Sequence, residues 1–435
     1  MRHTVPAFTR LGPGPGEPWA RYSRWRRELA AAEALLLVEF HFTAAWLENA
    51  APEPLTAIYY VNDKNLQIAV TNQPLAAESA APGEQFARWL VRHRLVAFDP
   101  ARPLQLAPVH IDKPWGRELW YTGVERRGVC DFVRGDARTP IPWLQAVTPP
   151  EMLGTLARPL VLLKILDPHP EPGRGDLYFE LHESKRELYV VSHVDRRAWP
   201  DGVGYIRFGF DPALVASYAD DREFRADYLA AVREYEAQRR ELDELQECGV
   251  APDASQVARE QLLAQRMHRF THMYPLREGD IVEVPLLLPH ALQHGVRVVE
   301  FQTPSYERKI LSFGQKVLTQ THWDTADVVA KMQLVARRER PRGGDQVDHG
   351  GVVVERIAEF PDFEVFRAAF EPGARWHLQS LASYNLIMIQ AGTLELAGES
   401  YGHEQAVLLP RFWRGTLTAS EPAPPLVLLL SRPRS

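Results

Sequence analysis

Short apolar runs cut by proline and glycine dominate the pattern of hydrophobic and polar positions along the chain. Two of them, Val161–Leu163 and Leu188–Val191, lie in a stretch from 108 to 194 that is broken too often for long helices, so β-structure is predicted there. Strand patterns return at 280–284 and 296–301. We therefore expect a mainly β fold.

Apolar residues at helical spacing mark a region near the N-terminus. There the repeat of Trp25, Leu29, Ala32 and Leu36 predicts a short amphipathic helix that opens the fold. Beyond it, apolar runs on both sides of 62–65 predict two strands, and 86–96 predicts a second helix. The segment is therefore mixed α/β.

A second helical region lies between two β-rich stretches. Apolar residues recur at helical spacing from 224 to 245 and again from 257 to 270, with a break at 249–252. This pattern predicts two helices joined by a turn. Since strands are expected on both sides, the helices form an insertion, at about 211–271, within one β-domain.

The length and local composition of the chain indicate several domains. A chain of 435 residues exceeds the usual size of a single core. Residues 337–350 are charged, contain Pro341 and the pair Gly343–Gly344, and lack periodicity, which predicts a linker. The expected division is a mixed α/β segment of unknown role at 1–107, a β-domain with its insertion at 108–336, the linker, and a second β-rich domain at 351–435.

Charge and cysteine content exclude several classes of protein. The formal net charge of −6 argues against a nucleic-acid-binding chain, which needs a basic face. Cys130 and Cys248 lack metal-type spacing and offer no disulfide framework. The apolar run at 35–38 is too short for a membrane span or a signal peptide. We expect a cytoplasmic protein without membrane contact.

Two separate segments carry candidate metal ligands. Residues two apart on a strand share a face, so Glu180 and His182 would project together, and Glu187 can return on the next strand after a short turn. In the second segment, Gly279 and Pro285 precede His290, which could supply a fourth ligand. An isolated Glu-x-His pair is more often ordinary surface alternation, but the combined spacing favours a metal site.

These spacings resemble those of the cupins. In that family two ligands separated by one residue are followed by a glutamate, and a second motif joins a glycine, a proline and a histidine; Glu180, His182 and Glu187 fit the first motif, and Gly279, Pro285 and His290 fit the second. The resemblance implies a jelly-roll barrel, a double-sheet antiparallel architecture whose interior holds the site. It also implies a second cupin-like barrel near the C-terminus.

Within the cupins, the helical insertion resembles type I phosphomannose isomerases, whose zinc ligands are Gln, His, Glu and His. Glu180 stands at the Gln position. Lys164, Lys185 and the segment 113–119 resemble other family features, and 300–308 resembles the run that ends in the family's active-site arginine. The resemblance covers roughly residues 113–324.

The resemblance implies a function and a set of roles. Glu180, His182, Glu187 and His290 would bind a divalent ion, foremost zinc, with manganese or iron as alternatives. Glu300 would act as base, Arg308 would steady an enediolate, and Lys164 and Lys185 would place positive charge near substrate oxygens. The implied activity is an aldose–ketose isomerase acting on a sugar phosphate or related sugar. Ordinary salt bridges remain an equal alternative for Lys164, Lys185 and Glu300.

Other features depart from the isomerase pattern. Glu183 replaces the family's proline after His182, and the long stretch between His182 and Glu187 is compressed to four residues. A metal-containing cupin that binds a sugar without turnover is therefore a second hypothesis, and an iron-dependent oxygenase is a third.

His294 and the run His322–Asp324 are interpreted as structural. His377 and His403 lack partners, and Gly415 stands where a ligand would follow Pro410, so no metal is expected in the C-terminal barrel. The oligomeric state is left open.

Overall fold

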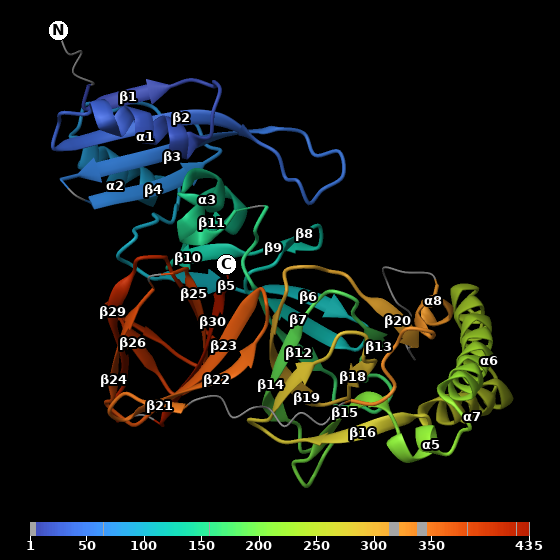
Figure 1. Cartoon of the computed structure of the whole chain (residues 1–435). Coiled ribbons are helices and arrows are strands. Elements are labelled where there is room, and N and C mark those ends of the chain that lie inside the picture. Colours follow the sequence, from blue (N-terminus) through green and yellow to red (C-terminus); the bar gives the residue numbers. More distant parts are fainter. Residues whose placement is uncertain are drawn as a thin grey trace. The chain divides into compact units, whose positions relative to one another are not determined.

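The computed structural model describes residues 6–63, 65–155, 157–312, 322–336, 346–380, 382–422 and 424–434. It is mainly β, as the sequence predicts (Figure 1). Its contacts divide the chain into two compact units. One unit comprises 1–109, 120–163 and 343–435, and the other comprises 110–119 and 164–342. No helix in the described part of the chain is long and apolar enough to cross a membrane.

The first unit begins with a four-stranded sheet in the order β1-β2-β3-β4, in which only β1 and β2 run parallel. Its strands are β1 (Phe8–Leu11), β2 (Glu33–Phe42), β3 (Glu53–Asn62) and β4 (Asn65–Thr71), and its helices are α1 (Pro18–Glu28) and α2 (Pro82–Arg92). The strands on either side of 62–65 and the helix near 86–96 are thus confirmed.

The opening helix is shorter than the sequence pattern predicts. It ends at Glu28, and Leu36 lies in β2 instead. The run Leu35–Val38 is fully buried, with Leu35 and Leu37 packed among the residues around α2. A short continuous apolar run fits a strand buried on both faces as well as it fits a helix, and periodicity alone does not separate them.

The same unit contains a β-sandwich. Nine strands in the order β11-β10-β5-β28-β25-β30-β23-β22-β21 face four in the order β24-β29-β26-β27, over an apolar core that includes Ile387, Leu409 and Trp413. Its strands are β5 (Leu104–Ala107), β10 (Asp131–Arg134), β11 (Ala137–Pro140), β21 (Gln346–Asp348), β22 (Val352–Glu359), β23 (Phe363–Phe370), β24 (Arg375–Gln379), β25 (Asn385–Ala391), β26 (Leu394–Leu396), β27 (Glu399–Tyr401), β28 (Ala406–Leu409), β29 (Arg414–Ala419) and β30 (Leu426–Pro433).

The unit boundaries differ from the division drawn on the sequence. β5 pairs with β28, and β10 and β11 extend the same sheet, so 120–163 packs with the C-terminal strands. This stretch also contains the hairpin of β8 (Val124–Glu125) and β9 (Gly128–Val129), and the helices α3 (Ile141–Val147) and α4 (Pro150–Leu153). Of the expected linker, 337–345 lies outside the described residues, and Gln346–Asp348 form β21, which pairs with β22.

The second unit is a double-sheet barrel. One sheet has the order β17-β14-β19-β12-β7-β6 and the other β16-β15-β18-β13-β20, with an apolar core between them that includes Val191, Ile206 and Val298. Its strands are β6 (Val109–Lys113), β7 (Gly116–Trp120), β12 (Leu162–Pro168), β13 (Phe179–Leu181), β14 (Glu187–Val194), β15 (Gly204–Phe210), β16 (Thr271–Leu276), β17 (Ile281–Val284), β18 (His290–Leu292), β19 (Val296–Gln302) and β20 (Lys309–Ser312). The predicted jelly-roll architecture is confirmed.

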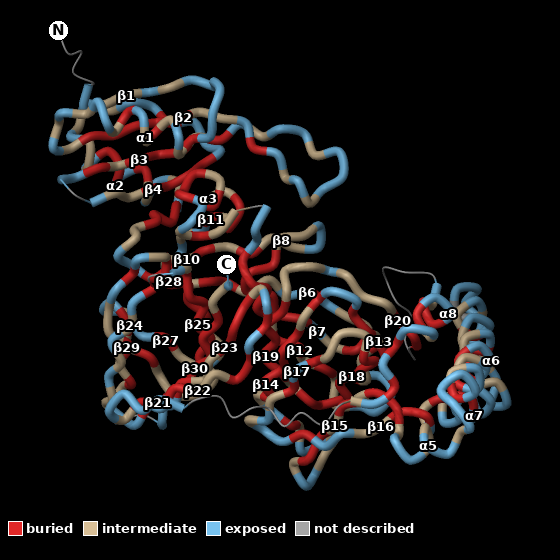
Figure 2. Tube along the Cα trace, in the orientation of Figure 1, coloured by how far each residue is buried: buried red, intermediate tan, exposed pale blue. Residues whose placement is uncertain are grey.

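The helical insertion follows β15 and precedes β16. It consists of α5 (Pro212–Ala216), α6 (Asp221–Glu247) and α7 (Ala254–His268), and a further short helix, α8 (Thr325–Val328), follows β20. Phe224 and Tyr228 of α6 pack edge-on against Phe210 at the end of β15. Much of the remaining surface of α6 and α7 is exposed (Figure 2). The two predicted helices and their turn are therefore confirmed.

Candidate metal centre

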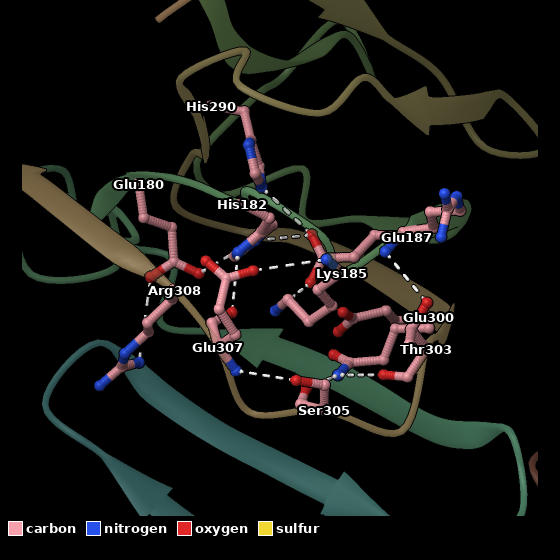
Figure 3. Close-up of polar contacts among 12 residues, drawn as sticks. Glu180, His182, Lys185, Glu187, His290, Glu300, Thr303, Ser305, Glu307 and Arg308 are labelled. Carbon is pink, nitrogen blue, oxygen red and sulfur yellow. Dashed lines mark hydrogen bonds and ion pairs between the residues drawn. The ribbon is translucent and has the colours of Figure 1, made fainter. Parts of the chain in front are cut away.

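Three strands bring the four candidate ligands to one place in the barrel. Glu180 lies on β13, His182 follows that strand, Glu187 opens β14, and His290 opens β18. Glu180 is paired directly with His290 in the antiparallel register of β13 and β18. The side chains of His182 and His290 point toward the carboxylate of Glu187 (Figure 3).

The atoms of His182, Glu187 and His290 have the spacing of a coordination shell. One ligand atom from each of the three buried residues lies within 4.8 Å of the others. Oε2 of Glu187 is 3.1 Å from Nε2 of His182 and 3.3 Å from Nε2 of His290. Tetrahedral coordination with bonds of about 2.0–2.1 Å places ligand atoms about 3.3–3.4 Å apart. Both distances to Oε2 of Glu187 are close to that spacing.

The hydrogen bonds of the two imidazole rings orient their Nε2 atoms toward the carboxylate of Glu187. Nδ1 of His182 lies 3.1 Å from the carbonyl oxygen of Glu307, and Nδ1 of His290 lies 3.1 Å from that of Leu288. A carbonyl oxygen only accepts, so each Nδ1 carries a proton, and a ring in this tautomer presents a lone pair at Nε2. Burial lowers the pKa of His182, which keeps its ring neutral.

This arrangement fits a cation. Both Nε2 atoms are buried without a hydrogen-bond donor among the described residues, and both face the carboxylate of Glu187. Two lone pairs and an anionic oxygen repel one another unless a positive centre lies between them. The contacts of each Nδ1 with a backbone carbonyl are the outer interactions that usually orient a ligating histidine.

Glu180 lies beside this trio. Its Oε1 is 3.7 Å from Nε2 of His182, and its Oε2 is 3.9 Å from the guanidinium of Arg308. It does not belong to the mutually close set of three among the described residues. Burial opposes ionisation of Glu180, but Arg308 and, to a smaller degree, His182 lower its pKa overall. It is therefore an anionic neighbour of the trio.

Paired charges line the barrel next to the trio. Nζ of Lys185 is 2.5 Å from Oε1 of Glu187, and Nζ of Lys164 is 3.0 Å from Glu300. Burial and the charge of Glu187 raise the pKa of Glu300 in spite of Lys164, whereas His182 and Lys185 hold the pKa of Glu187 low against its burial. Burial disfavours the charge on Lys164, but Glu300 and nearby carboxylates raise its pKa overall. The predicted polar residues thus gather around one centre.

Two further residues belong to the site although sequence reasoning did not single them out. The hydroxyl of Tyr189 donates to Oε2 of Glu187 over 3.1 Å. Tyr189 lies two residues after Glu187 on the same strand, and this spacing could have predicted that the two side chains share a face. Glu307 contacts both His182 and the turn after it, across more than a hundred residues of sequence. Nothing in its local sequence distinguishes it from a surface loop residue.

Three other histidines that the sequence analysis considered have different surroundings. His294 forms a 2.7 Å contact with Asp176 and stacks on Trp199. His322 is exposed beside buried Asp324, and His377 approaches Thr416. Within the described residues, none of these joins a group of three potential ligands.

Solved structures match this chain, whereas no protein-family model and no curated protein matches its sequence. Mannose 6-phosphate isomerase from Bacillus subtilis aligns with a TM-score of 0.54 and 14% identity over 76% of this chain and 99% of its own. The fold is that of a phosphomannose isomerase. A variant of the Salmonella typhimurium enzyme and a zinc-bound mannose 6-phosphate isomerase each align with a TM-score of 0.50 and 11% identity, over 77% of this chain and 100% of their own. Part of this chain has no counterpart in these isomerases.

Proposed function

We propose that the protein is a metal-dependent aldose–ketose isomerase acting on a sugar phosphate or a related sugar. The observation that carries the proposal is the convergence of two imidazole lone pairs on the buried carboxylate of Glu187. The shared fold with a zinc-bound mannose 6-phosphate isomerase supports it. In the proposal His182, Glu187 and His290 hold the ion, and Glu180 completes the ligands.

The donor set favours zinc. Imidazole nitrogen and carboxylate oxygen are both common zinc ligands, while manganese and iron tolerate the same atoms. A bound ion would polarise neighbouring carbonyl and hydroxyl oxygens of a sugar. Glu180 adds a second carboxylate, which strengthens attraction for a divalent ion and reduces the positive charge that remains for polarisation.

In the proposal, the residues around the ligands move a proton. Isomerisation removes a proton from C2 of an aldose and returns one to C1, through an enediol. Ionised Glu300 would accept and return that proton, and its raised pKa moves it toward the working pH of a general base. Lys164, 3.0 Å away, steadies the ionised form. Arg308 would donate to the developing oxyanion.

One observation favours a second function, sugar binding without turnover. The side chain of Glu300 is only 1% exposed and is engaged by Lys164, so a substrate carbon would have to reach a well-buried carboxylate. In this alternative the ion and Arg308 would bind sugar oxygens, and the protein would serve a regulatory or structural role.

The test is a metal analysis coupled to a turnover assay. Metal-replete protein would be incubated with hexose and pentose phosphates and with free sugars, and products separated by mass spectrometry. We expect interconversion by the wild type and its loss in Glu300→Gln with the metal content unchanged. Absence of interconversion with every sugar would refute the isomerase, and thermal stabilisation by a sugar without product would support the alternative.

A further inference from the structure

Glu307 connects two loops that carry site residues. Its carboxylate accepts hydrogen bonds from the backbone N–H groups of Glu183, Ser184 and Lys185, at 3.1, 3.1 and 3.3 Å. Its own carbonyl oxygen accepts from Nδ1–H of His182 at 3.1 Å. One residue therefore binds the turn after the first motif with its side chain and a proposed metal ligand with its backbone (Figure 3).

The turn that Glu307 binds is the short connection between β13 and β14. The segment from Glu183 to Arg186 carries the chain from His182 to Glu187 and contains Lys185, whose ammonium contacts Glu187. Successive backbone N–H groups that point to one side form a concave anion site. Here a carboxylate of the same chain occupies it, and the three backbone bonds lower the pKa of Glu307 against its partial burial.

The next residue along the chain is Arg308. Its guanidinium lies 3.9 Å from Oε2 of Glu180 and 5.5 Å from the ring centre of Tyr178. Because the Glu307 carboxylate anchors this loop, the same contacts that place the carbonyl for His182 also place the backbone from which Arg308 extends. A shift of Glu307 would move an imidazole and a guanidinium together.

We propose that Glu307 is a positioning residue that holds His182 in the orientation required for metal binding and sets Arg308 beside Glu180. This role rests on the proposed metal site, but it does not depend on the identity of the sugar. The carboxylate acts through the backbone: its bonds to the turn fix the loop, and the loop carbonyl fixes the tautomer and direction of His182. Glu307 itself need not touch an ion or a substrate.

Cobalt binding provides the test, because the visible spectrum of Co²⁺ reports the geometry of its ligands without any turnover. Glu307→Ala is expected to weaken Co²⁺ binding by about 10- to 100-fold, the usual effect of losing an outer-shell partner, and to change the d–d absorption. Glu307→Gln keeps an accepting oxygen and the side-chain size, so its affinity should fall between those of the wild type and Glu307→Ala.

The matched control is Glu278, whose carboxylate accepts from the backbone N–H of Val194 and contacts His193 in the same barrel. Glu278→Gln should leave Co²⁺ affinity and spectrum unchanged. Wild-type affinity and spectrum in both Glu307 variants, even with a lower melting temperature, would overturn the positioning role. If Glu307→Ala does not fold, Glu307→Gln decides the question. Failure of the wild type to bind Co²⁺ would instead overturn the metal site, whereas binding without isomerisation would overturn only the proposed activity.

Discussion

Replacing Lys164 by methionine tests the buried charges next to the metal centre. Lys164 has a 12% exposed side chain and lies 3.0 Å from Glu300, whose side chain is 1% exposed. The substitution keeps the apolar stem and removes the charge, so an ionised Glu300 would be left without its partner. Breaking a buried pair in this way typically destabilises a protein by about 3–5 kcal/mol.

The loss of stability should depend on pH, because Glu300 can take up a proton and so avoid carrying an unpaired buried charge. Its pKa in the folded protein is raised above the unfolded value by burial, so its ionised form weakens the fold, and stability is lost as pH rises above the unfolded pKa. Protonating a carboxyl with an unfolded pKa of about 4.3 costs about 2 kcal/mol at pH 6 and about 5 kcal/mol at pH 8. The loss in Lys164→Met should therefore be larger at pH 8.

The assay is urea-induced unfolding of EDTA-treated protein at pH 6 and pH 8. Lys164→Met should lose up to about 3 kcal/mol more at pH 8 than at pH 6, and Lys164→Met/Glu300→Gln should remove most of that difference. Arg240→Met breaks a more exposed pair with Glu236 and should cost less than about 1 kcal/mol at either pH. An equal loss of stability at both pH values, or a larger loss at pH 6, would show that protonation of Glu300 does not set the cost of removing Lys164.

Two further substitutions test other contacts. Tyr189→Phe removes the hydroxyl that donates to Glu187, and we expect metal affinity, measured by competition with a chelating dye, to fall by about tenfold; unchanged affinity would contradict the role of this bond. Burial beside Arg207 lowers the pKa of His268 to about 3, so the unfolded chain binds the extra proton first, and stability should fall by about 1.4 kcal/mol per pH unit below about 6.5. His268→Gln should flatten this acid slope in calorimetric melting curves, and an unaltered slope would exclude His268 as its source.

The local part of the candidate metal centre was predictable from the sequence. Glu180, His182 and Glu187 come together because side chains alternate along β13 and the chain returns directly into β14. His290 joins them from more than a hundred residues away, and its spacing from Gly279 and Pro285 was the signal that connected it. The two long helices were predictable because their apolar residues keep helical spacing over many turns.

Other features depend on contacts that no local pattern contains. The buried run around Leu36 is equally compatible with a helix and a strand, and it forms a strand because neighbouring strands of the sheet pair with it. The packing of 120–163 with the C-terminal strands follows from the pairing of β5 with β28, about three hundred residues apart in sequence. Glu307 is an ordinary polar loop residue until the fold places its carboxylate against the turn after His182.

The most direct test of the central claim is X-ray absorption at the metal edge of protein purified with its native ion. We expect a divalent metal with two imidazole nitrogens and one or two carboxylate oxygens at about 2.0–2.1 Å, and loss of one imidazole in His290→Ala. Metal-free protein that cannot be loaded, or a spectrum unchanged by His290→Ala, would contradict it.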